Sequence, residues 1–487
     1  MPEPSRKRRL LVLGICCLSL FIVGLDATIV NVALPSIGRD LHSSVSGLQW
    51  TIDAYTLVLA SLLMFSGSTA DRIGRRKTFQ AGLALFTLGS LLCSLAPALG
   101  WLVAFRMLQA VGGSMLNPVA MAIITNTFTE PAERAKAIGV WGGVFGLSMA
   151  LGPVAGGALV DSIGWRGIFW VNIPVGIAAI VLTALFVPES RADRYRRPDP
   201  VGQVLVIVML ASLTYAIIEG PSSGWGSAKI LTFFGVAVAA LAAFLVYEPR
   251  RADPLIDPRF FRSAPFSGAT ATAVSAFAAL GGFLFLNTLY LQDVRGFSPL
   301  TAGLYLFPMA VTLAVCAVLS GRIVASRGPR IPLVTAGIAL IIAGALLTRL
   351  TDVTSAGFLV LSYMVFGVGS GLVNAPITNA AVSGMPRQQA GVAAAVASTS
   401  RQVGTSLGVA VMGSVLADNL RGPMRTGFVH ASQPGWWIVA ACGAIIGVLG
   451  IVTTGPWARR TAARTAALLE PAGEQPPVAS ETSPAAG

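Results

Sequence analysis

Charge is scarce in this chain of 487 residues, because Asp, Glu, Lys and Arg together make up only 11% of it. A soluble domain carries about 25% of these residues, so the composition excludes an ordinary water-soluble fold. Histidine is almost absent, and both copies, His42 and His430, fall in expected loops. Proton transfer inside the apolar segments therefore has to rely on carboxylates.

Cysteine is also sparse, and its positions indicate no site. All five cysteines lie in apolar segments and lack the short spacings of metal ligands or of a disulfide framework. A phosphate-binding loop is missing too, because Arg76 rather than Gly precedes Lys77 and Thr78. We therefore expect no cofactor or metal and no enzyme activity, and an ATP-driven pump would need a separate subunit. A membrane enzyme or sensor is less favoured, since no stretch is large enough for a soluble domain.

Apolar residues, in contrast, are abundant: they form 54% of the chain and come in long blocks. A helix that crosses a bilayer needs about 20 apolar residues. We expect an all-α polytopic membrane protein with fourteen transmembrane helices. The expected ranges are 10–34, 48–70, 79–98, 101–125, 135–160, 167–187, 201–219, 228–247, 266–291, 301–321, 331–350, 355–380, 390–417 and 436–456.

Positive charge is distributed unevenly between the loops of this scheme. Clusters such as Arg6–Arg9, Arg72–Lys77 and Arg322–Arg330 all fall on one side. Because cytoplasmic loops carry the excess of Lys and Arg, we expect both termini in the cytoplasm and the helices in the plasma membrane of a bacterial cell. The net charge of +13 then reflects topology and not nucleic-acid binding.

The two ends of the chain repeat one another. Gly67 and Gly74 are spaced like Gly321 and Gly328, and a Gly-rich run before Asn117 resembles one before Asn374. Related halves with a site between them are a transporter plan. The expected organisation is a basic N-terminus (1–9), a six-helix bundle (10–187), a linker (188–200), two inserted helices (201–247), a linker (248–265), a second six-helix bundle (266–456) and a disordered tail (457–487).

One acid, Asp26, interrupts the first apolar run between Leu10 and Pro35. A carboxylate at that depth costs roughly 2.5–3.5 kcal/mol on insertion scales and usually marks function. At about 1.5 Å rise per residue, Arg106 and Asp53 lie at a similar depth. We expect Asp26 to couple transport to protons, with Arg106 as its modulator and Asp53 as a further candidate. The alternative is that Asp26 is a packing acid with a permanent partner.

The loop that contains Gly67, Asp71, Arg72, Gly74 and Arg75 resembles the signature loop of the major facilitator superfamily. The helix-one motif around Asp26 and the motif from Trp165 to Gly176 are similar to those of fourteen-helix drug:proton antiporters. The resemblance implies two six-helix bundles plus two inserted helices, and export of a hydrophobic or amphipathic drug or antibiotic in exchange for protons by alternating access. Metabolite uptake or exchange is the alternative.

Gating is expected from two of these segments. Asp71, Arg72 and Arg75 can form an ionic latch, although these arginines could also serve only topology. Three glycine pairs on the expected fifth helix are each four residues apart: Gly139/Gly143, Gly142/Gly146 and Gly152/Gly156. With a kink at Gly152 and Pro153, they suit a moving interface between the halves. Simple helix packing is the alternative explanation.

Polar residues within the spans are the expected substrate-binding residues: Asn31, Tyr55, Gln109, Asn117, Asn287, Tyr290 and Asn374. Such residues face protein or water rather than lipid, and hydrogen bonds between helices are the competing explanation. Arg401 is left open between an anionic substrate and a structural pair. The expected partners are a small-molecule substrate, protons and the lipid bilayer, with no nucleic acid, and the chain is expected to work as a monomer.

Overall fold

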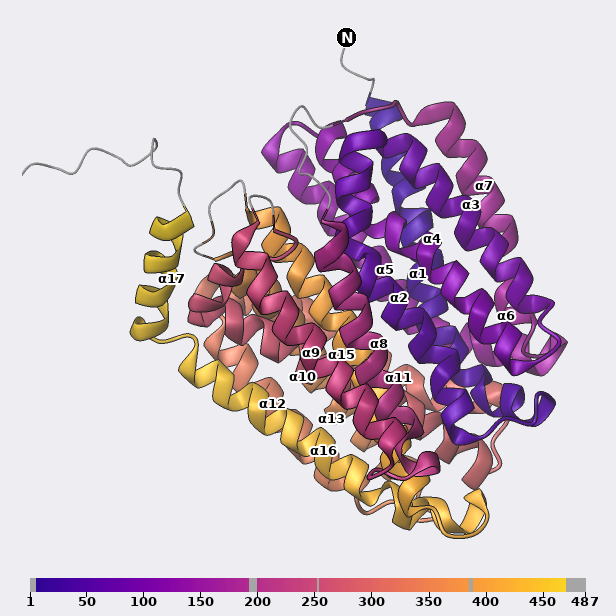
Figure 1. Cartoon of the computed structure of the whole chain (residues 1–487). Helices are drawn as coiled ribbons and strands as arrows, with labels where there is room; N and C mark the ends of the chain where they lie inside the picture. The colour runs from indigo at the N-terminus through magenta and orange to yellow at the C-terminus, as the bar shows by residue number, and fades with distance from the viewer. Residues whose placement is uncertain (1–5, 192–198, 252–253, 384, 386–388, 470–487) are drawn as a thin grey trace, which may run out of the picture.

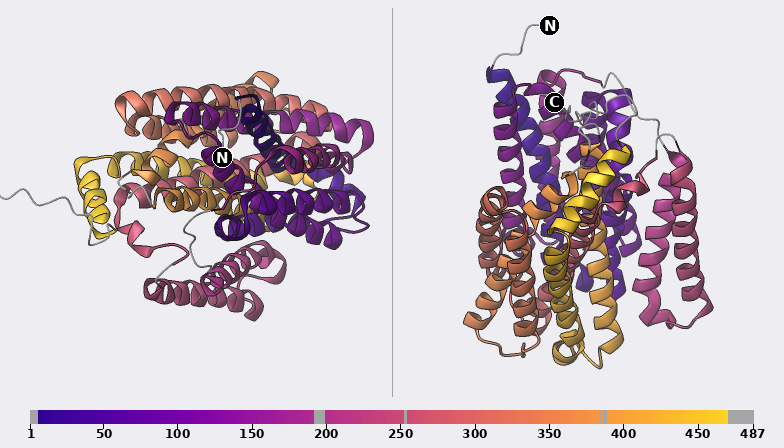
Figure 2. Two further views of the ribbon diagram at one scale, coloured as in Figure 1. Left: turned by 90° about the horizontal axis from the view of Figure 1, so that it is seen from above. Right: turned by 90° about the vertical axis from the view of Figure 1, so that its left-hand side faces the viewer.

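The computed structural model describes residues 6–191, 199–251, 254–383, 385 and 389–469. Within them, every regular element is a helix, and most of the helices run side by side in one bundle (Figure 1). The start of α1 and the helix α17 lie at the same end of this bundle (Figure 2). We call it the terminal end, and the opposite end the far end.

The first half of the bundle contains seven helices. They are α1 (Arg6–Asp40), α2 (Val45–Ile73), α3 (Arg75–Ser94), α4 (Leu99–Thr127), α5 (Pro131–Ile163), α6 (Gly167–Trp170) and α7 (Asn172–Phe186). The Ser44 hydroxyl caps α2 by accepting a bond from the amide of Gly47. Gly74, with φ +130°, is the single residue between α2 and α3, in a conformation that favours glycine. α6 and α7 together cover the expected span 167–187, with a break at Val171.

Two helices stand beside the bundle, α8 (Pro200–Ser223) and α9 (Ala228–Tyr247), followed by the short turns η1 (Glu248–Arg250) and η2 (Pro258–Arg262). α8 is hydrogen-bonded to both halves of the protein. Gln203 Nε2 donates to the carbonyl of Ser61 on α2 at 2.5 Å, and Trp50 Nε1 donates to Glu219 at 3.0 Å. On the other side, Ser414 Oγ of α15 donates to the carbonyl of Ile217.

The second half follows η2. It consists of α10 (Ala264–Leu289), η3 (Tyr290–Val294), α11 (Pro299–Arg327), α12 (Arg330–Leu347), α13 (Ala356–Leu372), α14 (Asn374–Val382), α15 (Ala390–Asn419), α16 (Met424–Val452) and α17 (Pro456–Leu469). Among the described residues, twelve helical segments are long and apolar enough to cross a membrane, and α3 and α15 are not among them. The polytopic all-α fold is therefore confirmed, while the count of fourteen spans stays a prediction.

Two expectations about the end of the chain need correction. α16 starts at Met424 rather than near 436, so His430 lies in a helix and not in a loop. Residues 457–469, expected as part of a disordered tail, belong to α17, which begins at Pro456. Pro456 suits the first turn of a helix, alanine and arginine favour its interior, and Ala462 and Leu469 are buried on its inner face. The remainder of the expected tail, 470–487, lies outside the described residues.

The two halves are packed together mainly at the far end. Leu25 to Ile37 of α1 share one buried apolar cluster with residues of α10, α15 and α16, whereas Val12 to Val23, nearer the terminal end, belong to a cluster of the first half. Gln292 Nε2 donates to the carbonyl of Val32 at 2.7 Å. The amide of Leu300 donates to Asp161 Oδ2 at 3.0 Å. The far end is therefore the closed end of this conformation.

The glycines of α5 show the same difference between the two ends: they are closely packed near the far end and have open space nearer the terminal end. Gly157 lies against the backbone at Pro299 and Leu300, and Gly303 of α11 lies against the carbonyl of Pro153. Nearer the terminal end, a Cβ at Gly139 or Gly143 would meet no atom within 4 Å. Close packing through small residues thus holds for the far part of α5, while the expectation for the Gly139/Gly143 and Gly142/Gly146 pairs is not met in this conformation.

We predict that Gly303→Val separates the halves at the far end, because its side chain would collide with the backbone at Pro153. Overpacking of this kind costs about 1–3 kcal/mol. The measurement is the disulfide yield between cysteines placed at Asp161 and Leu300, which should fall severalfold in the variant. Gly139→Val is the matched control, with open space around it. Equal cross-linking in both variants would contradict the packing argument.

Candidate functional site

The carboxylate of Asp26 lies at the centre of a buried polar network in the first half. Asp26 has no exposed surface, and its Oδ2 is 2.6 Å from Nη1 of Arg106 on α4. Its Oδ1 accepts hydrogen bonds from Gln109 Nε2 at 2.9 Å and from Asn172 Nδ2 at 3.2 Å. Three donors from two helices thus satisfy both carboxylate oxygens, so neither buried oxygen is left without a partner.

Arg106 is held as firmly as the acid. Its Nη1 also donates to Gln109 Oε1 at 2.7 Å, and its Nε donates to the carbonyl of Thr51 on α2 at 3.3 Å. The guanidinium carbon lies 4.1 Å from the centre of the Tyr55 ring, a cation–π distance. Only 2% of the side chain surface is exposed. Any movement of α2 against α4 therefore changes the surroundings of the ion pair.

Two members of the network were not among the predicted site residues. The Ser90 hydroxyl of α3 accepts bonds from Gln109 Nε2 at 2.7 Å and Asn172 Nδ2 at 3.0 Å, which orients both amides toward Asp26. Asn172 carried a signal, since it lies in the motif from Trp165 to Gly176. Ser90 carried none, because a lone serine in an apolar helix gives no sign of its partner.

Asp53 lies apart from this network. It is fully buried on α2, where the hydroxyls of Thr56 and of Ser406 on α15 are its polar neighbours, although neither makes a hydrogen bond of standard geometry to its carboxylate oxygens. One helical turn away, Gln49 Nε2 donates to the carbonyl of Ala410 at 2.7 Å. Asp53 therefore sits at the contact between the two halves, and the expected shared layer holds for Asp26 and Arg106 but does not bring Asp53 into contact with them.

A cavity of about 60 Å³ lies between the two halves, next to the ion pair of Asp26 and Arg106. Arg106 and Tyr55 form part of its wall, whereas Asp26 lies behind them. The lining residues come from α1, α2, α4 and α5 on one side and from α10 and α15 on the other; they include Thr28, Asn31, Ile52, Phe145, Met149, Phe277, Leu284, Gln402 and Thr405. Sites for drug-sized ligands measure about 300–1,000 Å³, so the halves must part further before such a molecule fits.

The structure distributes the seven predicted substrate-binding residues over several places. Asn31 and Tyr55 line the cavity, and Gln109 belongs to the Asp26 network. In the second half, Asn287 Oδ1 accepts a bond from Tyr363 at 2.7 Å. Tyr290 donates to the carbonyl of Thr351 at 2.6 Å. The other two, Asn117 on α4 and Asn374 on α14, do not line the cavity either.

The residues predicted to gate the protein fall into two groups. Asp71 and Arg75 form an ion pair at 3.0 Å within the first half, and Arg72 is exposed. The amide of Arg76 donates to Glu189 at 3.1 Å, again within that half. Gly152 faces Thr28 of α1, and the carbonyl of the following residue, Pro153, faces α11. Only this second group touches the contact between halves in the described conformation.

Arg401 of α15 has a polar and an aromatic neighbour. Its Nη2 donates to Thr378 Oγ1 at 2.6 Å, and its guanidinium carbon is 5.9 Å from the centre of Phe277. Its buried Nε has no partner among the described residues. Because Phe277 lines the cavity, Arg401 is the cation of the second half that lies near it.

Comparison with known proteins gives consistent results. Residues 16–409 match the family model of the Major Facilitator Superfamily. The multidrug resistance protein Stp of Mycobacterium tuberculosis is 38% identical over 411 residues, which cover 84% of this chain and 76% of that protein. The tetracenomycin C resistance and export protein of Streptomyces glaucescens is 37% identical, covering 85% and 77%. A puromycin resistance protein of Streptomyces alboniger is 37% identical, covering 88% and 87%.

Among solved structures, a bacterial homologue of the human lysosomal transporter Spinster, described as inward-facing and unoccupied, superposes with a TM-score of 0.67. It is 18% identical, and the match covers 95% of this chain and 99% of that one. At that identity the likeness concerns the fold alone.

Proposed function

This chain belongs to the major facilitator superfamily, and from that premise we propose that it is a proton-coupled antiporter that exports hydrophobic or amphipathic small molecules. Its relatives at 37–38% identity are named for resistance to drugs and antibiotics, which supports drug efflux as the coarse function. Exchange with protons is the finer part of the proposal. It depends on one observation above all, the buried ion pair between Asp26 and Arg106 next to the cavity.

The ion pair supplies a chemical basis for coupling. Burial of an unpaired carboxylate is costly, so Asp26 is stable as an anion only while its donors remain in place. In the described conformation the Arg106 guanidinium stabilises the ionised form. Movement of α2 or α4 that withdraws Arg106 would favour transfer of a proton onto Asp26. Proton binding and helix position are then linked in both directions.

The asymmetry of the two ends supports alternating access. The described contacts between halves concentrate at the far end, and basic residues gather at the terminal end, which we infer to be cytoplasmic. The conformation is then one that faces the cytoplasm and has released its proton there. Opening of the far end would expose the cavity outside, where the substrate leaves and a proton reaches Asp26. The chain is proposed to do this as a monomer.

Asp53 is the second proton site that we propose. Its carboxylate is buried where α2 meets α15, beside the hydroxyls of Ser406 and Thr56 and without a hydrogen bond of standard geometry to either, and burial of an ionised acid in such surroundings is costly. Separation of α2 from α15 would admit water and allow the proton to leave. If Asp53→Asn keeps the full pH dependence of exchange, this second site is excluded.

Transport into inverted vesicles tests the proposal. Vesicles that contain the chain are given an acidic interior, and the uptake of fluorescent dyes, puromycin and tetracenomycin C is followed. We expect uptake of at least one of them to follow the proton gradient and to collapse with an uncoupler. Uptake that needs ATP and resists the uncoupler would instead indicate a primary pump. Gradient-driven transport only in the opposite direction would favour metabolite uptake.

A further inference from the structure

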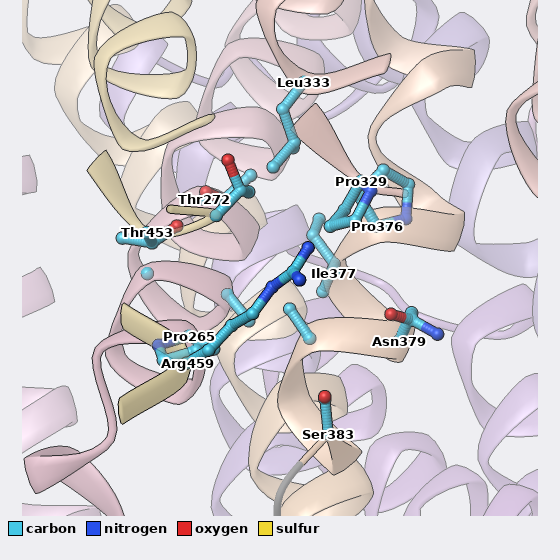
Figure 3. A pocket seen from close by; sticks show the side chains of 14 residues that line it. Pro265, Thr272, Pro329, Leu333, Pro376, Ile377, Asn379, Ser383, Thr453 and Arg459 are labelled. Atoms are coloured by element: carbon cyan, nitrogen blue, oxygen red, sulfur yellow. The ribbon is translucent and has the colours of Figure 1, made fainter. Parts of the chain in front are cut away.

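A second and larger pocket lies within the second half, at the terminal end. Its volume is about 230 Å³, and it opens between the first turns of α10 and α12, the end of α14 and the junction of α16 with α17 (Figure 3). It is separate from the cavity between the halves, and the two sets of lining residues have no member in common. Nothing in the proposed transport cycle uses it.

The pocket contains a single charge. Arg459 of α17 is the only charged residue among the fourteen described residues that line it. Figure 3 shows its side chain extending across the opening toward Ile377, with Asn379 and Ser383 on the facing wall. A guanidinium presents planar pairs of N–H donors, which match phosphate and carboxylate oxygens. The charge of the pocket therefore selects an anion.

The inner wall offers an unused hydroxyl group. Thr272 of α10 is 99% buried, since its exposed fraction is 1%, and its Oγ1 has no hydrogen-bond partner among the described residues. It lies eight residues after the start of α10, or about 12 Å along the helix. A buried hydroxyl without a partner is unfavourable, and an anion held by Arg459 would supply the missing acceptor.

The helix that carries Arg459 has the composition of a membrane-surface helix. α17 has three arginines, Arg459, Arg460 and Arg464, and no acid between Pro456 and Leu469. Trp457 and Leu468 are apolar and exposed. A basic amphipathic helix with such residues lies at the interface between lipid headgroups and acyl chains. The pocket then opens at the level where phospholipid phosphates are concentrated.

We propose that this pocket binds a phosphate group and that an anionic phospholipid of the adjacent leaflet supplies it. Arg459 holds the phosphate oxygens at the mouth, and the Thr272 hydroxyl donates to the headgroup from the inner wall. The volume suits a headgroup, because it lies below the range of about 300–1,000 Å³ for drug-sized ligands. The bound lipid would fasten α17 to α10 and α14, so the C-terminal helix responds to membrane composition.

Lipid binding to the purified full-length chain tests this proposal. The protein in detergent is titrated with phosphatidylglycerol or phosphatidylcholine, and bound lipid is counted by native mass spectrometry. We expect phosphatidylglycerol to bind preferentially. Arg459→Gln should weaken that binding by about tenfold or more, as the loss of a hydrogen-bonded charge predicts. Thr272→Val, which keeps shape and charge, should weaken it by about threefold or more.

Arg460→Gln is the matched control, because it removes the same charge one residue further along α17 but does not line the pocket. It should change the affinity by less than about twofold. Equal losses in Arg459→Gln and Arg460→Gln would overturn the proposal in favour of general surface charge. Inorganic phosphate and glycerol phosphate are added as competitors. Displacement of the lipid at micromolar phosphate would overturn the lipid assignment, and equal binding of both lipids would overturn the site.

Discussion

Asp26→Asn is expected to abolish proton-driven uptake into inverted vesicles while substrate still binds. Asparagine keeps the size of the side chain and one acceptor oxygen, but it cannot bind or release a proton. Asp26 does not line the cavity between the halves, so the binding surface should remain. The measurement is uptake under an imposed pH gradient, together with substrate affinity by equilibrium binding. Uptake should fall to the level of empty vesicles, and affinity should change by less than about tenfold.

Asp40→Asn is the control for this experiment. Asp40 ends the same helix and also pairs with an arginine, since its Oδ2 lies 2.8 Å from Arg166 Nη1. That pair is partly exposed, and the Asp40 side chain retains 48% of its surface. The substitution should leave gradient-driven uptake near that of the unaltered protein. Undiminished uptake by Asp26→Asn would remove Asp26 from the coupling mechanism.

Arg106→Gln is expected to destabilise the first half strongly. It leaves the Asp26 carboxylate buried without its cationic partner, and breaking a buried pair costs about 3–5 kcal/mol. The double variant Asp26→Asn, Arg106→Gln removes both charges together and should regain most of that stability. The measurement is the free energy of unfolding in mixed micelles for the two single variants and the double variant, which yields the coupling energy.

Arg166→Gln supplies the comparison at the surface. It breaks the exposed pair with Asp40, and such pairs contribute about 0–1 kcal/mol. A coupling energy for Asp26 and Arg106 as small as that value would show that the two buried charges interact weakly. The pair could then not drive a conformational change. Full additivity of the two single variants would lead to the same conclusion.

The sequence predicts which site residues lie at the same depth in the membrane, because the number of residues along a helix fixes that depth. Asp26 and Arg106 lie at matching heights in their spans, and the structure places them 2.6 Å apart. Depth says nothing about the direction in which a side chain points around its helix. Depth therefore placed Asp53 in the same expected layer as Asp26 and Arg106, although it faces α15. Ser90 was missed for a related reason, because its role depends entirely on the two amides that reach it.

The helices of the fold are predictable where the length of an apolar run determines them. They are less predictable where contacts with neighbouring helices determine them. Every expected span overlaps a helix or a broken pair of helices, although several boundaries differ. The breaks at Val171 and Val373 each lie three residues before a proline, Pro174 or Pro376, which lacks the amide hydrogen of a helical bond. The expected spans passed over this signal. α17 was missed because its sequence is not apolar enough to span a bilayer, and its helix is fixed by the contacts of Ala458 and Leu469. An amphipathic surface helix of this kind is predicted by apolar residues that recur on one face of the helix, not by a long apolar run.

The hairpin of α8 and α9 makes the two flanks of the transporter unequal. α8 is bonded to α2 and to α15 and so covers the seam along which these helices meet. The opposite seam, between α5 and α11, lies outside the reach of this hairpin. A lipophilic molecule in the bilayer would consequently meet the hairpin on one flank and the helices of the two halves themselves on the other, a difference that neither six-helix half has by itself.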